Sequence, residues 1–365
     1  MLAILVLLKN YQKLEAEKIK NLPFFFIIGR PRTGTTLLQL FFDAHPNVQI
    51  PSECMHVGQL FIHYNGVKKW DAQIIDNFIQ DFCKTWLFTF DKFNVAQIKK
   101  DLNYYIDSLN YSMVCKIIAK NYNTVYKKEE LLICGDKNPL YSQVFGSIFK
   151  IIDNSKFIHL VRDPRDTHIS LFNTRFVSPS ITYNTKRWVN SVKTLDVYSK
   201  HYPQLIYTLK YEDLVTEPEK YLKEICDFLN IPFSPEMLNY LDEKESLTKV
   251  AFVNDGYKQK YHLSVCEKVN TKKIDQWKTR LSSGKIKKAE KVAGDWLEKY
   301  GYEKKFKSPG WWTNFSTLPG LCLYYFIEWE RRQVKYLSKK WQLKIALKSH
   351  IPFLYLWKFY GNKKI

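Results

Sequence analysis

One stretch near the amino terminus constrains the fold more than any other. An apolar run, residues 24–28, leads into a loop bounded by Gly29 and Gly34, and apolar residues at helical spacing follow from Thr35. The helix should end just before Pro46, because a proline disfavours the α conformation in the preceding residue. A strand, a glycine loop and a helix N-terminus form a site for phosphate-like anions, since backbone N–H groups point at the ligand and the helix dipole favours negative charge.

The loop differs from that of nucleotide hydrolases at one position. It reads Gly-x-x-x-x-Gly-Thr-Thr from Gly29 to Thr36, and Thr35 stands where those enzymes carry a lysine. The basic groups come earlier, at Arg30 and Arg32. Without the lysine the loop is poorly suited to a triphosphate with magnesium, but its N–H donors, hydroxyls and charged clamp suit a 5′-phosphosulfate. An ordinary strand–turn–helix connection with incidental glycines is the alternative.

The net charge of the chain indicates an anionic partner. Its 56 lysine and arginine residues outnumber 36 acidic residues, which gives a formal net charge of +20. A nucleotide, an acidic acceptor, an anionic membrane surface and nucleic acid all fit such a charge. Because the charge is spread along the chain and no nucleic-acid-binding motif is present, we expect no nucleic acid partner.

The cysteines and the amino terminus indicate the cellular compartment of the protein. The seven cysteines are scattered and form no Cys-x-x-Cys pair, which argues against a zinc site and a disulfide framework and is typical of a reducing compartment. The first eight residues are apolar, whereas a membrane span needs about 20 such residues. A signal peptide carries basic residues ahead of its apolar run, and none is present here. We therefore expect a cytoplasmic protein, either free or peripheral at the membrane.

Strand-like and helical patterns alternate after the loop and predict an α/β fold. It should be P-loop-like and doubly wound, with a mainly parallel sheet and helices on both faces. Besides the first strand, the predicted strands are 48–50, 131–134, 156–161 and 205–209. Residues 55–128 show only helical spacing and predict a helical insertion that covers one side of the site. We divide the chain into an N-terminal helical segment at 1–21, a catalytic domain at 22–303 and a basic, aromatic helical tail at 304–365.

Chemically active side chains follow several of these strands. Glu53 comes after strand 48–50 and Lys137 after strand 131–134. Arg162 directly follows strand 156–161, and Ser170 lies one or two turns into the next helix. Parallel α/β sheets place their ligands at the carboxyl ends of the strands. We therefore expect these four residues and the glycine loop to form one site.

Two of these motifs together resemble a known family. The loop from Gly29 to Leu37 resembles the 5′-phosphosulfate loop of sulfotransferases that use 3′-phosphoadenosine 5′-phosphosulfate, and residues 160–166 with Ser170 are similar to their 3′-phosphate motif. Residues 211–214 and 276–278 are also similar to that family, though less specific. The likeness extends over residues 22–303.

Within the family, the likeness is closer to the branch that contains tyrosylprotein sulfotransferases and bacterial relatives. Residues 43–48, the later Glu53, and Lys137 in a Gly-Asp-Lys-Asn-Pro stretch carry it. Ser52 is a departure, since that branch often has a second acidic residue there. The peptide-binding region of the tyrosylprotein enzymes is not recognisable. We therefore rank a protein tyrosine below a carbohydrate, a lipid or a small alcohol as the acceptor.

The resemblance implies a role for each site residue. The 5′-phosphosulfate would be held by the loop residues Arg30, Arg32, Thr33, Gly34, Thr35 and Thr36. Arg162 and Ser170 would bind the 3′-phosphate, while Asp163 and Arg165 would pair with each other or with neighbours. Glu53 would be the general base, Lys137 would neutralise charge on the leaving oxygen, and Arg32 would assist. No metal is required, because protein cations carry the charge.

Several alternatives stay open. His45 and His56 are rival bases to Glu53. A P-loop kinase of a small molecule would also use a glycine loop, although the missing lysine argues against it. A membrane-associated protein that binds a nucleotide without catalysis is the third interpretation, and the presence of Glu53 and Lys137 argues against it.

The tail combines aromatic and basic residues. Val334, Leu337, Trp341 and Ile345 fall at helical spacing, with lysines and arginines on both sides. This pattern predicts a helix lying in a membrane interface, with aromatic rings at headgroup depth and bases toward anionic lipid. A tail helix packed between the catalytic domain and another element is the alternative.

Overall fold

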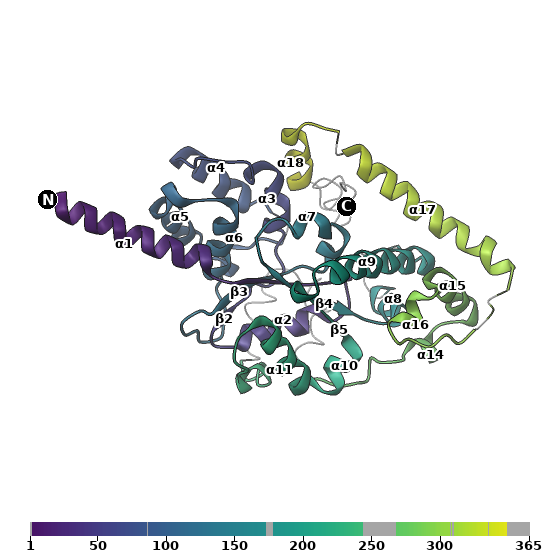
Figure 1. Cartoon of the computed structure of the whole chain (residues 1–365). Coiled ribbons are helices and arrows are strands. Elements are labelled where there is room, and N and C mark those ends of the chain that lie inside the picture. Colours follow the sequence, from purple (N-terminus) through teal and green to yellow (C-terminus); the bar gives the residue numbers. More distant parts are fainter. Residues whose placement is uncertain are drawn as a thin grey trace.

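The computed structural model describes residues 2–85, 87–172, 178–243, 268–306, 308, 310–334 and 336–348 (Figure 1). Within these residues, five strands form one fully parallel sheet in the order β2–β3–β1–β4–β5. The strands are β1 (Phe24–Gly29), β2 (Val48–Gln49), β3 (Ile133–Lys137), β4 (Lys156–Val161) and β5 (Ile206–Lys210). The predicted fold class is confirmed.

Helices fill most of the remaining described chain. The α-helices are α1 (Leu2–Asn21), α2 (Thr35–Ala44), α3 (His56–Tyr64), α4 (Ala72–Phe82), α5 (Val95–Tyr104), α6 (Tyr111–Lys120), α7 (Phe145–Ile148), α8 (Pro164–Phe172), α9 (Ile181–His201), α10 (Tyr211–Thr216), α11 (Pro218–Leu229), α14 (Trp277–Arg280), α15 (Ser283–Ala293), α16 (Trp296–Lys299), α17 (Trp312–Val334) and α18 (Lys339–Lys348). Short 3₁₀ helices are η1 (Phe90–Lys92), η2 (Ile106–Ser108), η3 (Pro139–Gln143), η4 (Pro203–Leu205) and η5 (Pro235–Met237). No described helix has both the length and the apolar character of a membrane span.

Strand β1 is buried on both faces, which explains its unbroken apolar run. Phe25 and Ile27 pack with Leu38 and other residues of α2, while Phe24 and Phe26 face the opposite core formed with α3 and α6. Figure 1 shows helices on both faces of the sheet. The two cores hold β1 in the middle, and with it the loop that follows.

The strand order places a ligand site beside the end of β1. After β1 the chain builds β2 and β3 on one side and then crosses to β4 and β5 on the other. Gly29 of β1 pairs with Leu160 of β4, and Ile27 pairs with Lys137 of β3. Because all strands run in the same direction, their carboxyl ends lie at the same edge of the sheet. The polar residues there meet beside β1, where the strand order reverses.

The third strand lies later in the sequence than predicted. The expected range was 131–134, whereas β3 spans Ile133–Lys137, so Lys137 is the last residue of the strand and does not follow it. Gly135 permits this continuation, because a Cβ atom there would lie 2.6 Å from the ring of Phe25 on the neighbouring strand. Asp136 can then occupy a buried strand position next to Lys137.

The helical character of residues 55–128 is confirmed. The segment contains α3 to α6, and its only described β contact is an isolated bridge between Phe93 and Tyr122. Its apolar residues join the core on one face of the sheet. The idea that this segment shapes one side of the active site stays a prediction.

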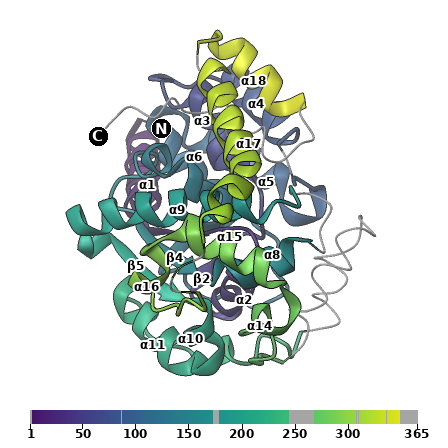
Figure 2. The ribbon, with the colours of Figure 1, turned by 90° about the vertical axis from the view of Figure 1, so that its right-hand side faces the viewer.

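The described part of the tail contains two helices, but its predicted apolar stripe is wrong. The stripe from Val334 to Ile345 requires one continuous helix, whereas α17 ends at Val334 and α18 starts at Lys339. Ser338 explains the break, since its hydroxyl accepts the N–H of Trp341 at 3.4 Å and caps a new helix. Helix α17 packs along α9 and α15, and α18 contacts α3 (Figure 2).

Candidate active site

The loop between β1 and α2 folds tightly on itself. Thr33 donates its backbone N–H at 3.2 Å and its hydroxyl at 2.7 Å to the carbonyl oxygen of Arg30. Arg32 and Gly34 adopt the left-handed region, with φ of 73° and 92°. Gly34 also has no room for a side chain, because a Cβ atom would lie 2.5 Å from the ring of Tyr211. Both backbone conformation and packing therefore require glycine at this position.

The first turn of α2 presents backbone donors at the loop. Gly34 precedes the helix without a side-chain cap, and the first turn contains no acidic residue. Thr35 is buried and Thr36 is partly exposed at the start of the helix. An N-terminus of this kind attracts anions, since its first N–H groups have no partner within the helix and the dipole is positive there.

Arg32 joins this loop to the segment after β4. Its Nε atom donates to the hydroxyl of Ser170 in α8 at 3.0 Å. Arg162 donates Nη1 to the carbonyl oxygen of Arg32 at 3.1 Å. The structure thus brings three predicted phosphate ligands together. It also places Arg32 between the predicted 5′ and 3′ subsites, because Ser170 bonds Arg32.

The side chain of Arg162 is held by two more groups. Its guanidinium lies over the ring of Tyr211, 4.4 Å from the centroid. Its Nη2 atom donates to the carbonyl oxygen of Lys273 at 2.6 Å. These contacts orient a buried cation at the carboxyl end of β4. A planar guanidinium that is already oriented loses less conformational freedom when it binds a phosphate.

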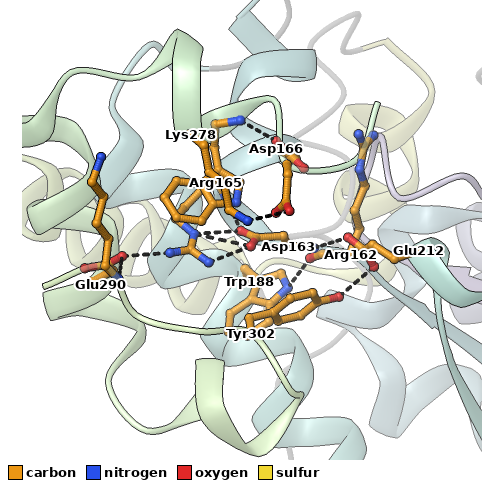
Figure 3. A network of polar contacts seen from close by, with 12 residues as sticks. Arg162, Asp163, Arg165, Asp166, Trp188, Glu212, Lys278, Glu290 and Tyr302 are labelled. Atoms are coloured by element: carbon orange, nitrogen blue, oxygen red, sulfur yellow. Dashed lines mark hydrogen bonds and ion pairs between the residues drawn. The ribbon is translucent and has the colours of Figure 1, made fainter. Parts of the chain in front are cut away.

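The backbone around Arg162 is fixed as well (Figure 3). The indole Nε1 of Trp188 donates to the carbonyl oxygen of Arg162 at 3.0 Å. The next N–H, that of Asp163, donates to Oε1 of Glu212 at 3.1 Å. Glu212 in turn accepts the hydroxyl of Tyr302 at 3.0 Å, and burial raises the pKa of Glu212. The peptide that carries Arg162 is therefore hydrogen-bonded on both sides.

A second cluster joins the ends of β2 and β3 to α2. The Nζ atom of Lys137 lies 3.2 Å from Oε2 of Glu53 and 3.4 Å from the hydroxyl of Thr36. The Lys137 side chain is 2% exposed, whereas that of Glu53 is 23% exposed. Lys92 of η1 donates to the carbonyl oxygen of Glu53 at 3.4 Å. The cluster contains a carboxylate open to solvent, a buried cation and a hydroxyl at the helix N-terminus.

The two rival histidines are built into the protein interior. His45 bonds the carbonyl oxygen of Pro232 through Nε2 at 2.8 Å and accepts the N–H of Asn47 through Nδ1 at 3.1 Å. His56 is 2% exposed and packs edge-on against Phe82, and burial lowers its pKa to about 3. Both histidines are thus enclosed in the core, whereas the side chain of Glu53 is 23% exposed and can be reached from solvent.

The predicted pairing of Asp163 with Arg165 is confirmed, and it belongs to a larger network (Figure 3). Arg165 contacts Asp163 and Glu290 at 2.7 Å each and lies over the ring of Trp277, 3.5 Å from the centroid. The N–H of Trp277 donates to Asp166 at 2.8 Å. This network fixes the start of α8 against α14 and α15.

Glu290 extends this network to the segment after α16. Its two carboxylate oxygens accept the N–H groups of Lys305 and Phe306 at 2.8 and 2.9 Å. Because Glu290 also bonds Arg165, a single buried carboxylate joins α8 to the chain that leads into α17. In the part of the chain that the structure describes, no group of three or more His, Cys, Asp or Glu side chains could hold a metal ion.

Sequence reasoning identified the groups that point into the site and missed several that hold them. Trp188, Glu290, Tyr302 and the carbonyl oxygen of Lys273 carried no motif. The similarities at residues 211–214 and 276–278 were the available signals. Tyr211 and Glu212 contact the Arg162 segment, and Trp277 contacts Arg165 and Asp166. A lone buried tryptophan or glutamate far along the chain gives no such signal.

Comparison with known proteins identifies the family of this chain. The sequence profile described as the Sulfotransferase family matches residues 23–235. The chain belongs to the sulfotransferase family. The matched range includes the loop after β1, Glu53, Lys137, Arg162 and Ser170. This sulfotransferase is therefore a transferase enzyme, and the predicted family is confirmed.

Several relatives of this sulfotransferase carry a functional name. A putative protein-tyrosine sulfotransferase of Caenorhabditis briggsae is 25% identical over 292 residues, which cover 78% of this chain and 90% of the relative. Protein-tyrosine sulfotransferase 1 of Danio rerio is 22% identical, covering 80% of this chain and 76% of the relative. These names do not support our expectation that a protein tyrosine ranks below other acceptors.

Among solved structures, the sulfotransferase domain from the Synechococcus PCC 7002 olefin synthase is similar to this chain. The likeness has a TM-score of 0.48 and 23% identity, and it covers 75% of this chain and 95% of that domain. The fold described above rests on the strand order and pairing, not on this likeness.

Proposed function

We propose that this sulfotransferase moves a sulfuryl group from 3′-phosphoadenosine 5′-phosphosulfate to an acceptor hydroxyl by in-line displacement, with Glu53 as the general base. The observation that carries the proposal is the cluster of Glu53, Lys137 and Thr36 at the N-terminus of α2. It combines a proton acceptor, a cation and hydrogen-bond donors within one site. In-line transfer of a charged group depends mainly on positioning and charge stabilisation, which these groups supply.

The residues present fit this donor. The uncapped N-terminus of α2, with Thr35, Thr36 and Arg32, suits the 5′-phosphosulfate. Arg162 and Ser170 meet at Arg32 and suit a second phosphate. Arg30 is buried at the base of the same loop, whose fold depends on Thr33 and Gly34. Two anion-binding subsites that meet at Arg32 match a nucleotide that carries phosphates at both the 3′ and 5′ positions.

Each residue of the second cluster has a distinct task in this proposal. Glu53 accepts the proton of the acceptor hydroxyl as its oxygen bonds to sulfur, a task typically worth about 10²–10⁴-fold in rate. Lys137 and Arg32 neutralise charge on the oxygen that leaves with adenosine 3′,5′-bisphosphate. Both cations belong to the protein, so the proposal requires no metal. The exposed fraction of Glu53 gives an acceptor access to the base.

The acceptor is a hydroxyl compound whose class we leave broad. The relatives named above are protein-tyrosine sulfotransferases, so a tyrosine phenol is a candidate beside carbohydrates, lipids and small alcohols. Incubating the enzyme with labelled donor and fractions of its own cells should transfer label to one class. The acceptor is tyrosine if label appears on protein and if a peptide substrate accepts label only when it contains tyrosine.

Thermal stabilisation tests the donor separately. Adenosine 3′,5′-bisphosphate should raise the unfolding midpoint in a concentration-dependent way, as any ligand of the native state does. ATP with magnesium should have a much smaller effect. The opposite order, with magnesium-dependent turnover of ATP, would favour the kinase alternative. Stabilisation by the bisphosphate without transfer to any acceptor fraction would favour a binding protein without catalysis.

A further inference from the structure

Helix α17 carries its apolar side chains on the side that faces away from the protein. Six large side chains are each at least half exposed and recur along one side of the helix: Trp312, Phe315, Leu318, Tyr325, Phe326 and Trp329, at 69%, 57%, 50%, 57%, 56% and 55%. We call these six residues the α17 face. Large apolar surfaces that are exposed and contiguous mark interaction sites.

The opposite side of α17 packs on the protein with small and polar residues. Thr313, Thr317 and Tyr324 are buried there, at a spacing of four and seven residues. At Gly320 an added Cβ atom would lie 2.5 Å from the hydroxyl of Ser180, so the helix approaches the start of α9 closely. A surface helix of a globular protein normally has the reverse arrangement, with its apolar stripe inward.

This packing prevents the helix from turning its apolar face inward. Rotation would bring bulky rings to the position of Gly320, where even a single carbon atom has no room. Lys186 of α9 lies 6.0 Å from the Tyr324 ring centroid and 5.7 Å from that of Tyr325, which marks the edge between the two sides. Helix α17 lies on the outside of the molecule (Figure 2). The exposure of its six large apolar side chains shows that the α17 face is turned outward.

Composition and charge indicate the partner. Tryptophan and tyrosine, which supply half of the α17 face, are the residues enriched where hydrocarbon meets lipid headgroups. From Trp311 onward the chain has only two acidic residues, Glu328 and Glu330, and bases follow them throughout the tail. The neighbouring α15 adds the exposed Lys285 and Lys291. Bases on α15 and in the sequence that follows Glu330, together with the aromatic residues of the α17 face, complement an anionic lipid surface.

We propose that the α17 face is a docking surface for an anionic lipid bilayer, in which α17 lies along the interface with its aromatic side chains at headgroup depth. The sequence pattern predicts membrane contact at residues 334–345. The helix break at Ser338 interrupts that stripe, and the exposed aromatic side chains lie on α17 instead. This inference does not depend on the identity of the sulfuryl donor or acceptor.

Flotation of the full chain with vesicles tests the docking surface. The protein should bind phosphatidylcholine vesicles that contain phosphatidylglycerol, bind pure phosphatidylcholine more weakly, and be released by salt. The triple variant Trp312→Ser, Phe315→Ser, Trp329→Ser should lose at least about tenfold in partitioning, since each ring contributes apolar area to the interface. It should keep the circular dichroism spectrum and the unfolding midpoint of the unchanged protein, which shows that the fold is intact.

Phe90→Ser is the matched control, because this ring is 70% exposed on η1, outside the α17 face, and its loss should leave vesicle binding unchanged. In the unchanged protein, brominated phosphatidylcholine within the anionic vesicles should quench tryptophan fluorescence. Absence of binding at low salt, absence of quenching, or undiminished binding by the triple variant would each overturn the proposal. A dimer that the triple variant converts to a monomer would assign the face to a second copy of the chain instead.

Discussion

The ammonium group of Lys137 lies 3.2 Å from the carboxylate of Glu53, although 84 residues separate them in the sequence. The pair joins the end of β3 to the loop that follows β2, its neighbour in the sheet. The cation is almost fully buried and the carboxylate is partly open to solvent. A partly exposed carboxylate is thus held in place by a buried cation.

Replacing Glu53 by glutamine should separate binding from chemistry. Gln keeps the size of the side chain but cannot accept the acceptor's proton, so we expect turnover to fall by about 10²-fold or more while donor affinity changes little. Titration calorimetry with adenosine 3′,5′-bisphosphate and initial rates with labelled donor measure the two quantities. Glu129→Gln, which changes an exposed glutamate, is the control. Normal turnover of the Glu53 variant would remove Glu53 as the base.

Replacing Arg162 by alanine should discriminate between two nucleotides. Loss of a charge-assisted contact costs about 1.5–3 kcal/mol, which corresponds to about ten- to a hundredfold in Kd. We expect this loss for adenosine 3′,5′-bisphosphate and a much smaller one for adenosine 5′-phosphate. Arg280→Ala is the control, since Arg280 is exposed and bonds only Gln276 among the described contacts. Equal losses for both nucleotides would contradict the 3′-phosphate role.

Trp188 should act on donor binding through the backbone of Arg162. Trp188→Phe removes the indole N–H and leaves the Arg162 carbonyl oxygen unpaired, at a cost of about 1–3 kcal/mol in stability. We expect Trp188→Phe also to weaken the binding of adenosine 3′,5′-bisphosphate severalfold. In a protein that already carries Arg162→Ala, the same substitution should weaken binding less.

Trp70→Phe is the matched control for that effect. Trp70 is also buried, but its indole N–H meets no acceptor among the described residues, so the substitution breaks no such bond. It should leave nucleotide affinity unchanged. If both tryptophan variants weaken bisphosphate binding equally, Trp188 acts only through the stability of the core and does not position Arg162.

Asp136 should make stability depend on pH. Burial raises its pKa to about 7 from an ordinary value of 3.8. Between these values the unfolded chain loses the proton and the folded chain keeps it, so the native state loses stability as pH rises toward 7. Asp136→Asn cannot titrate. The unfolding midpoint of the variant should therefore rise relative to the unchanged protein between pH 4 and 7 and level off above pH 7.

Chemical denaturation across this pH range checks the prediction. The difference between the two proteins isolates Asp136, because buried histidines such as His159 titrate equally in both. Asp107→Asn controls for loss of an exposed carboxylate. A difference that stays constant, or shrinks, as pH rises would show that Asp136 is ionised in the folded state.

The sheet and the residues at its polar edge could be predicted because their causes are local. Strands buried on both faces appear as largely apolar runs, and β1 and β4 begin at the predicted residues, Phe24 and Lys156. The end of β3 was missed, because Gly135 and Asp136 do not favour a strand and are accepted only through pairing with β1. Residue propensities therefore predict that the strand ends at residue 134, whereas pairing with β1 extends it to Lys137.

The supports of the site could not be predicted, because they depend on contacts between distant parts of the chain. Glu290 lies 125 residues from Arg165, and Tyr302 lies 90 residues from Glu212. The side of α17 that faces the rest of the protein could not be predicted either. Its aromatic spacing is equally compatible with a core helix. The burial of Thr313, Thr317 and Tyr324 and the close approach at Gly320 show which side is inward.

The contact between Gly34 and Tyr211 has an evolutionary consequence. The glycine touches one part of the ring that lies beneath Arg162, so the start of α2, the tyrosine and the arginine form a single stack. A larger residue at position 34 could be accommodated only if position 211 became smaller, and the arginine would then lose the surface on which it rests. We expect these three positions to change together or not at all among descendants of a common ancestor, so that in an alignment they covary as one unit.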